Sequence, residues 1–224
     1  MIKNISNLGD AALYCDFGQE VNKETNTKVI KYFKSIQKEN IQGVNNLTPS
    51  YNKLIVSFDL KKTNFKSLKK KIEGLDTLNS NTLSGEKIEI PVCCDENFSL
   101  DIKRLEEKLK IDRENIYKNF FNKNFFCYMT GFIAGMPFLG DLDKTMRVKR
   151  LETPRVKVPK GSVGLTEQFA NIYTFESPGG WNIIGNTPKD IFDSSKEIEP
   201  NLINPGDTII FIRITKDQYQ NYNE

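Results

Sequence analysis

A short basic segment in the second half of the chain holds half of its arginines. Only 6 of the 32 basic residues are arginine, and Arg147, Arg150 and Arg155 lie close together. In a chain that otherwise uses lysine, arginine is expected where a rigid, two-pronged donor meets a carboxylate or phosphate. With Lys160 this segment predicts an anion-binding site. A solvated hairpin face with Glu152 as counter-charge explains it equally well.

The only tryptophan of the sequence follows a turn, in the segment Ser177-Pro178-Gly179-Gly180-Trp181. A proline and two glycines allow a tight turn whose backbone N–H groups approach a ligand, with the indole as an apolar wall. The alternative is an ordinary β-turn whose tryptophan fills the core. Three glycines also punctuate the apolar segment Gly131–Gly140, just before Asp141 and Asp143. They indicate close backbone approach at a bend beside a carboxylate, or a barrel corner.

The chain contains no histidine. This excludes Ser-His-Asp and Cys-His nucleophile activation and the HExxH metal helix. A general acid or base would have to be Asp141, Asp143, Glu176 or Tyr173, and their spacing does not choose among them. There is also no GxxxxGK[ST] loop and no GxGxxG turn, so a nucleotide would be held in a less stereotyped way.

The overall composition is that of a globular protein of two unequal domains. The 224 residues are 38% apolar and 27% charged, with a net charge of +3, which points neither to nucleic acid nor to a lipid surface. No apolar stretch is long enough for a membrane span, and the first residues lack a signal peptide's apolar core. The four cysteines include no CxxC spacing and predict neither disulfides nor a metal site. We therefore expect a cytoplasmic protein without a metal centre.

Apolar periodicity in the first 83 residues predicts a small α+β domain with helices on one face of a mostly antiparallel sheet. The expected strands are 12–17, 44–47 and 53–60, and the expected helices are 22–40 and 65–75, the second capped by Asn64. The polar segment 79–85 reads as a linker, so we place domain boundaries at 1–83 and 86–224.

The second domain is expected to begin with a strand at 87–92. A helix capped by Ser99 and a second short helix after Asp112 should follow. From Phe125 to Ile214, short apolar runs alternate with Gly, Pro, Asn and Asp turns. This pattern predicts a largely β domain, most simply a barrel.

Taken in order, several blocks of the sequence resemble the family of 5-oxoprolinase B subunits, which also includes allophanate hydrolase subunit 1 and a bacterial sporulation-kinase inhibitor. The most specific blocks are Gly131–Gly140, Leu151–Arg155, Val158–Gly164, Ser177–Trp181 with Ile184-Gly185, and Thr187-Pro188. The segments Leu8–Ala12, Pro49–Tyr51 and Asn204–Asp207 are similar to that family as well. Departures include Ala134-Gly135-Met136 where many relatives have Pro-Gly-Phe, and Phe169 in place of a frequent glutamine.

The resemblance implies an α+β fold in which a small, ferredoxin-like N-terminal domain precedes a cyclophilin-like β-barrel. It further implies one component of an ATP-dependent 5-oxoprolinase, which opens 5-oxo-L-proline to L-glutamate with a cyclophilin-like partner subunit and a third subunit. ATP, with Mg²⁺, would transfer phosphate to the amide oxygen. Two alternatives remain: an allophanate hydrolase subunit 1-type component, and a histidine-kinase inhibitor that binds its target without catalysis.

The resemblance aligns Arg150 and Arg155 with two family arginines that could neutralise phosphate or carboxylate charge. Together with Asp141, they are the candidate catalytic residues. The candidate ligand-binding or interface residues are Phe132, Phe138, Lys160, Gly161, Ser162, Ser177, Pro178, Gly179, Gly180 and Trp181.

Overall fold

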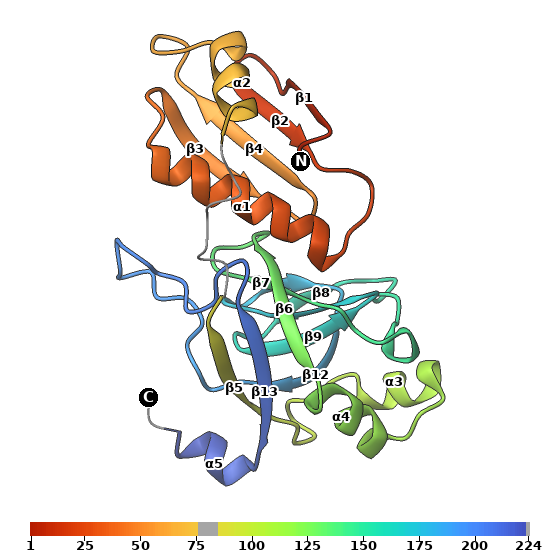
Figure 1. Ribbon diagram of the computed structural model, residues 1–224. Helices are drawn as coiled ribbons and strands as arrows, with labels where there is room; N and C mark the ends of the chain where they lie inside the picture. Colours follow the sequence, from red (N-terminus) through yellow and green to blue (C-terminus); the bar gives the residue numbers. More distant parts are fainter. Residues whose placement is uncertain (76–84, 223–224) are drawn as a thin grey trace. The chain divides into compact units, whose positions relative to one another are not determined.

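The computed structural model describes residues 1–75 and 85–222, and the chain forms two compact units, Met1–Ser84 and Gly85–Glu224 (Figure 1). The expected linker 79–85 lies outside the described residues, apart from Gly85. Each unit has its own apolar core. The units are therefore described separately.

Within residues 1–75, four strands form an antiparallel sheet in the order β1-β2-β4-β3. The strands are β1 (Asn4–Asn7), β2 (Ala12–Asp16), β3 (Val44–Pro49) and β4 (Lys53–Phe58), and the helices are α1 (Lys23–Glu39) and α2 (Phe65–Glu73). Asn22 and Asn64 cap the helices by accepting hydrogen bonds from Thr25 N (2.9 Å) and Ser67 N (3.0 Å). The Asn64 cap is as predicted, whereas β1 was missed.

One apolar cluster joins both helices to one face of this sheet. Alternate residues of β2 and β4, such as Leu13 and Val56, pack with Val29 and Ile36 of α1 and Leu68 of α2. Period-2 spacing in the strands and helical spacing in the helices bring these side chains together. Both helices therefore cover the same face of the sheet, as expected.

Within residues 85–222, seven strands close into a barrel in the order β10-β7-β6-β13-β5-β12-β9. The strands are β5 (Lys87–Cys93), β6 (Asn124–Thr130), β7 (Pro137–Gly140), β9 (Ser162–Thr166), β10 (Phe169–Ile172), β12 (Asn182–Asn186) and β13 (Thr208–Ile214). β5 and β13 run parallel, and the other neighbouring pairs are antiparallel. The predicted α+β class and the barrel are confirmed.

Two helices, α3 (Ile102–Leu109) and α4 (Arg113–Phe121), lie side by side at one end of the barrel (Figure 1). Phe120 of α4 stacks on Phe211 at a centroid distance of 4.8 Å and joins the barrel core. The short helix expected after Asp112 is present as α4, and the Asp112 side chain caps it by accepting from Asn115 N (3.0 Å). The predicted Ser99 cap of α3 is wrong, because its hydroxyl instead donates to Ile184 O (2.7 Å).

The remaining elements of this unit are a short 3-10 turn (Lys144–Met146), the strands β8 (Arg155–Val158) and β11 (Ser177–Gly179), and the C-terminal helix α5 (Lys216–Gln220). β8 and β11 pair with each other as a separate antiparallel ribbon. Most of the candidate residues lie in or next to this ribbon.

Candidate functional site

The β8–β11 ribbon covers a small apolar cluster that is separate from the barrel core. Along β9, β10 and β12, residues such as Leu165, Ala170 and Ile184 belong to the barrel core. Because side chains alternate along a strand, the residues between them face the other way. One of these is Ile183, which forms a buried cluster with Met136, Val158 and Tyr173. Ile133 and Phe138 are partly buried and pack against this cluster.

Arg155, the first residue of β8, is held by a buried carboxylate. Its Nη2 donates to Asp101 Oδ1 at 2.5 Å, and the Asp101 side chain is only 5% exposed. Asp101 is itself fixed, because its Oδ2 accepts from Ile183 N (2.7 Å) and its N–H donates to Ile183 O (3.0 Å). Arg155 Nη1 is buried without a hydrogen-bond partner among the described residues. The guanidinium therefore keeps one donor for another group.

Tyr173 lies under the Pro-Gly-Gly-Trp turn. Its side chain is buried, and a Cβ placed on Gly179 would lie 2.1 Å from its hydroxyl oxygen. Burial raises the pKa of the phenol, opposed by hydrogen bonds from Asn171 and the Trp181 backbone and by the positive charge of Arg155. The phenol is therefore protonated at neutral pH and available as a hydrogen-bond donor.

Asn171 is fully buried, and its Oδ1 has no hydrogen-bond partner among the described residues. A Cβ on Gly164 would lie 2.6 Å from this oxygen, so the glycine makes room for the amide. The indole of Trp181 stands edge-on to the Phe138 ring at a centroid distance of 5.6 Å. A buried amide oxygen without a partner is costly unless something else binds it.

A pocket of 160 Å³ opens beside this cluster and shares Tyr173 with it. We call it the Lys160 pocket. Its lining residues are Lys160, Gly161, Tyr173, Thr174, Thr187, Pro188, Lys189, Asp190, Ile191 and Tyr219. Lys160 Nζ pairs with Asp190 Oδ1 at 2.5 Å.

Many of the predicted site residues thus gather in one region. Phe138, Arg155, the turn 177–181 and the pocket residues Lys160 and Gly161 all lie around Tyr173. Ser162 lies next to the pocket, where Asn186 donates both to its Oγ (3.5 Å) and to Lys160 O (2.8 Å).

Three predicted residues stand apart from this region. Phe132 is 74% exposed and has a positive φ of 71°. Asp141 accepts hydrogen bonds from Tyr128 (2.8 Å) and Gln168 (3.2 Å). Arg150 is exposed and makes no hydrogen bond or ion pair with the described part of the chain.

Sequence reasoning missed Asp101 and Asn171. Asp101 precedes a helix, where an acidic residue ordinarily reads as a cap, so nothing in the sequence linked it to an arginine 54 positions away. Asn171 reads as a polar residue in an alternating strand. Its burial depends on the ribbon that covers that face of the barrel, which local pattern does not reveal.

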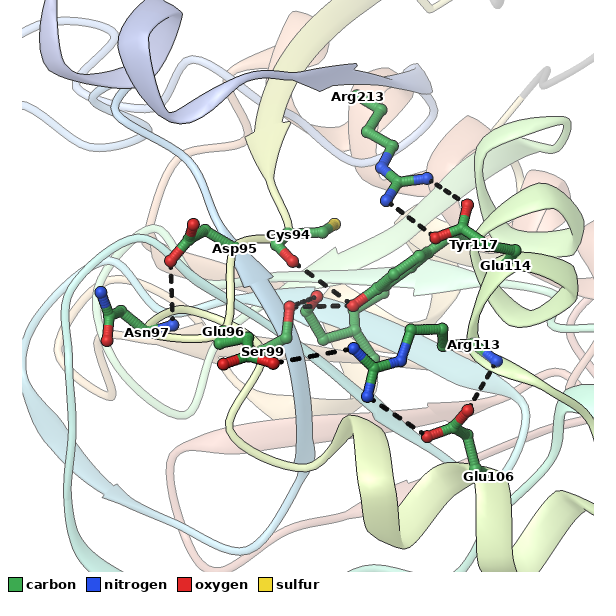
Figure 2. Close-up of polar contacts among 11 residues, drawn as sticks. Cys94, Asp95, Glu96, Asn97, Ser99, Glu106, Arg113, Glu114, Tyr117 and Arg213 are labelled. Carbon is green, nitrogen blue, oxygen red and sulfur yellow. Dashed lines mark hydrogen bonds and ion pairs between the residues drawn. The ribbon is translucent and has the colours of Figure 1, made fainter.

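Two further arginines, Arg113 and Arg213, bind carboxylates of their own chain (Figure 2). Arg213 donates to both oxygens of Glu114, at 2.8 and 3.3 Å, while its guanidinium lies 4.5 Å from the centre of the Tyr117 ring. Arg113 lies 3.7 Å from a Glu106 carboxylate oxygen. These contacts join α3, α4 and β13 and have a structural role.

Two features of the described residues bear on cofactors and location. They contain no group of three or more Cys, Asp or Glu side chains placed to hold a metal ion. Within residues 1–75 and 85–222, no helix is both long and apolar enough to cross a bilayer.

A family model and several curated proteins match this chain over nearly its whole length. The family described as "Carboxyltransferase domain, subdomain C and D" matches residues 3–203. The 5-oxoprolinase B subunit of Bacillus subtilis (strain 168) is 30% identical over 98% of this chain and 96% of its own length. Its Haemophilus influenzae namesake is 31% identical, over 93% of this chain and 97% of its own length.

Among solved structures, that of TTHA0988 superposes with a TM-score of 0.82 at 26% identity and covers 91% of this chain. The chain spans only 40% of TTHA0988, so the latter carries further sequence that this chain does not match. The chain belongs to the carboxyltransferase subdomain C and D family and is a relative of the bacterial 5-oxoprolinase B subunits.

Proposed function

We propose that the chain is the B-type subunit of an ATP-dependent 5-oxoprolinase, which opens 5-oxo-L-proline to L-glutamate together with partner subunits. The observation that carries this proposal is the 30% identity to the 5-oxoprolinase B subunit of Bacillus subtilis, which extends over 98% of the chain. A match of that extent includes both units, not the barrel alone. The name of this relative supports a multi-subunit assembly, in which we include a cyclophilin-like partner and a third subunit.

The proposal includes the finer fold assignment. We assign residues 1–83 to a ferredoxin-like domain and residues 86–224 to a cyclophilin-like barrel. The antiparallel sheet with two helices on one face supports the first assignment, and the closed barrel supports the second. The four free cysteines, all within the described ranges, support a reducing, cytoplasmic location.

The chemistry requires activation of an unreactive amide. Phosphate transfer from ATP to the amide oxygen makes the carbonyl carbon electrophilic, and cationic groups stabilise the charge that develops. Around Tyr173 the chain offers an Arg155 nitrogen and an Asn171 amide oxygen that lack partners among residues 1–75 and 85–222, together with a protonated phenol. Donors and an acceptor in one place suit an amide, which presents both an oxygen and an N–H.

The Lys160 pocket does not fit a whole nucleotide with its magnesium ion. Pockets for drug-sized ligands hold roughly 300–1,000 Å³, whereas the Lys160 pocket holds 160 Å³. No cluster of three potential metal ligands occurs among residues 1–75 and 85–222. We therefore place ATP and Mg²⁺ on the partner subunits and derive no step through them in this chain.

The test is ATP hydrolysis and glutamate release by the chain co-expressed with its candidate partner subunits. We expect 5-oxoproline to stimulate both, and allophanate to stimulate neither. Stimulation by allophanate would identify the alternative hydrolase instead. If a complex shown to be assembled responds to neither compound, the protein is better explained as a kinase-binding inhibitor.

Variants of the assembled complex separate the candidate catalytic residues. Arg150 is exposed and unpaired in the described chain, so Arg150→Ala is expected to lower turnover without lowering stability. Lys149→Ala, the neighbouring exposed side chain, is the matched control and is expected to leave turnover unchanged. For Asp141, an asparagine retains the shape but can accept from only one of Tyr128 and Gln168, so lost turnover in Asp141→Asn with unchanged stability would implicate the carboxylate. Equal turnover in all three variants would remove Arg150 and Asp141 from the catalytic set.

A further inference from the structure

The walls of the Lys160 pocket come from four separate segments of the barrel unit. They are the β8–β9 turn with Lys160 and Gly161, the residues Tyr173 and Thr174 after β10, the segment 187–191 after β12, and Tyr219 of α5. Ligand sites are commonly built from such converging loop segments on a rigid scaffold.

Hydrogen bonds fix these walls relative to one another. Gly161 N donates to Tyr173 O (2.7 Å), and Thr187 N donates to Gly161 O (2.9 Å). Asn186 links the β8–β9 turn to Tyr219 of α5, because its Nδ2 donates to Lys160 O and its Oδ1 accepts from Tyr219 OH, both at 2.8 Å. The pocket is therefore preorganised, which reduces the entropy lost on binding.

Gly161 allows the two main walls to approach closely. Its φ of +80° is unfavourable for other residues, and a Cβ there would lie 2.4 Å from Thr187 O. The clash would be with backbone, so a side chain at this position would force the walls apart. Gly161 is therefore required both by the backbone conformation of the turn and by the short distance between the pocket walls.

The charged groups of the pocket leave one net positive charge. Lys160 is paired with Asp190, while Lys189 makes no ion pair with the described residues. The Thr187 hydroxyl accepts from Lys189 N (3.2 Å), and its own proton has no acceptor within the described ranges. An ammonium group and a hydroxyl donor therefore remain for an anionic ligand.

We propose that the Lys160 pocket binds the carboxylate of a small, single-ring amide substrate, with Lys189 and Lys160 as its cationic contacts and Thr187 as a hydrogen-bond donor. This inference rests on the proposed function and specifies which part of the chain would hold 5-oxoproline. The small volume suits one ring. A single net positive charge matches a monoanionic carboxylate better than a phosphate group, which carries nearly two negative charges near neutral pH.

Calorimetric titration of the full chain, and of the assembled complex, tests the inference. The probes are 5-oxo-L-proline, 2-pyrrolidinone, which has the same lactam ring without the carboxylate, and inorganic phosphate. We expect binding of 5-oxoproline and at least tenfold weaker binding of 2-pyrrolidinone, in line with roughly tenfold for the loss of one charge-assisted hydrogen bond. Phosphate should not compete with 5-oxoproline.

Lys189→Gln is the informative variant, because it removes the unpaired charge and keeps most of the side-chain length. We expect it to weaken 5-oxoproline binding, and to raise KM in the complex, by roughly tenfold. Binding of 2-pyrrolidinone should not change. Lys103→Gln, on the exposed face of α3, is the matched control and should match the unaltered protein.

The outcomes separate this inference from the proposed function. If the complex converts 5-oxoproline but Lys189→Gln leaves KM unchanged, the pocket assignment is wrong and the function stands. If 5-oxoproline binds with the expected lysine dependence but no glutamate forms, the pocket assignment stands and the function fails. Absence of 5-oxoproline binding to both chain and complex, or tighter lysine-dependent binding of phosphate, overturns the inference.

Discussion

Asp101 and Arg155 lie 54 positions apart in the sequence, yet their side chains meet in an ion pair at 2.5 Å. The carboxylate also accepts the Ile183 backbone N–H, so one acidic side chain connects the loop before α3 to β8 and β12. The Arg155 guanidinium is thereby fixed, while its second terminal nitrogen has no hydrogen-bond partner in the described part of the chain. The arginine that the sequence marked as an anion binder is thus oriented by a carboxylate of its own chain.

Asp101→Asn is expected to destabilise the protein. The amide retains an oxygen for the Ile183 N–H but removes the charge opposite Arg155, which is largely shielded from solvent. We expect a decrease of about 1–3 kcal/mol in the free energy of unfolding, measured by urea denaturation. Glu176→Gln breaks the exposed pair with Lys157 and should leave stability unchanged. If both variants lost the same free energy of unfolding, burial would not make the Asp101–Arg155 pair more stabilising than the exposed Glu176–Lys157 pair.

Gly179→Ala is expected to disturb the site, whereas Gly180→Ala is not. A Cβ on Gly179 would lie 2.1 Å from the Tyr173 hydroxyl oxygen, while a Cβ on Gly180 would have its nearest neighbour at 3.6 Å. Because Tyr173 is buried, its phenol has little room to move, and overpacking of this kind costs about 1–3 kcal/mol. Thermal unfolding of the two variants gives the comparison. A Gly179→Ala protein as stable as Gly180→Ala would mean that the turn does not press on the phenol.

Local sequence patterns predicted much of the fold, because helix caps and strand alternation depend on residues that are close together in the sequence. The Asn64 cap, the short helix after Asp112 and the alternation in β5 are examples. The short edge strand β1 (Asn4–Asn7) was not predicted, because only Ile5 is buried and the segment shows no alternation of apolar and polar residues. The Ser99 cap failed because a long-range acceptor, Ile184 O, takes its hydroxyl.

The candidate site was predictable in part for the same reason. Glycine, proline and tryptophan mark the turn 177–181 in the sequence itself, and the structure places that turn over Tyr173. The partners of the site, Asp101 and Asn171, come from a loop and a strand that carry no such mark. Their roles depend on the register of β10 with β9 and on the ribbon pairing, which are properties of the assembled barrel.

Asp16→Asn is expected to make the protein less stable at pH 7 but not at low pH. Hydrogen bonds from Lys53 and from the Gly18 N–H lower the pKa of Asp16 from 3.8. Because the pKa is lower in the folded state, the Asp16 carboxylate stabilises the fold above pH 3.8, and this stabilisation is lost as the pH falls through the folded-state pKa. We expect a loss of less than about 1 kcal/mol at pH 7, because the pair is partly exposed. Urea denaturation of both proteins at pH 7 and pH 2.5 measures it, and an equal difference at both pH values would contradict the assignment.

The cysteine thiols are expected to resist alkylation in the folded protein. Burial raises the pKa of Cys15 and of Cys94 to about 12, and it also raises the pKa of Cys127. Since a thiolate is the reactive form and an ordinary cysteine has a pKa of about 8.5, very little thiolate exists at pH 8.

Alkylation by iodoacetamide at pH 8, located by peptide mass spectrometry, measures this directly. We expect each of these thiols to react more than roughly a hundredfold more slowly than in urea. The raised pKa values also imply stability that is lost as the pH rises from about 9 toward 12, because the unfolded chain then ionises first. Cys94 is the most informative position, since it is only partly shielded and lies near the Arg213 guanidinium. Labelling of Cys94 at the unfolded rate, with Cys15 protected, would show that the charge of Arg213 outweighs burial there.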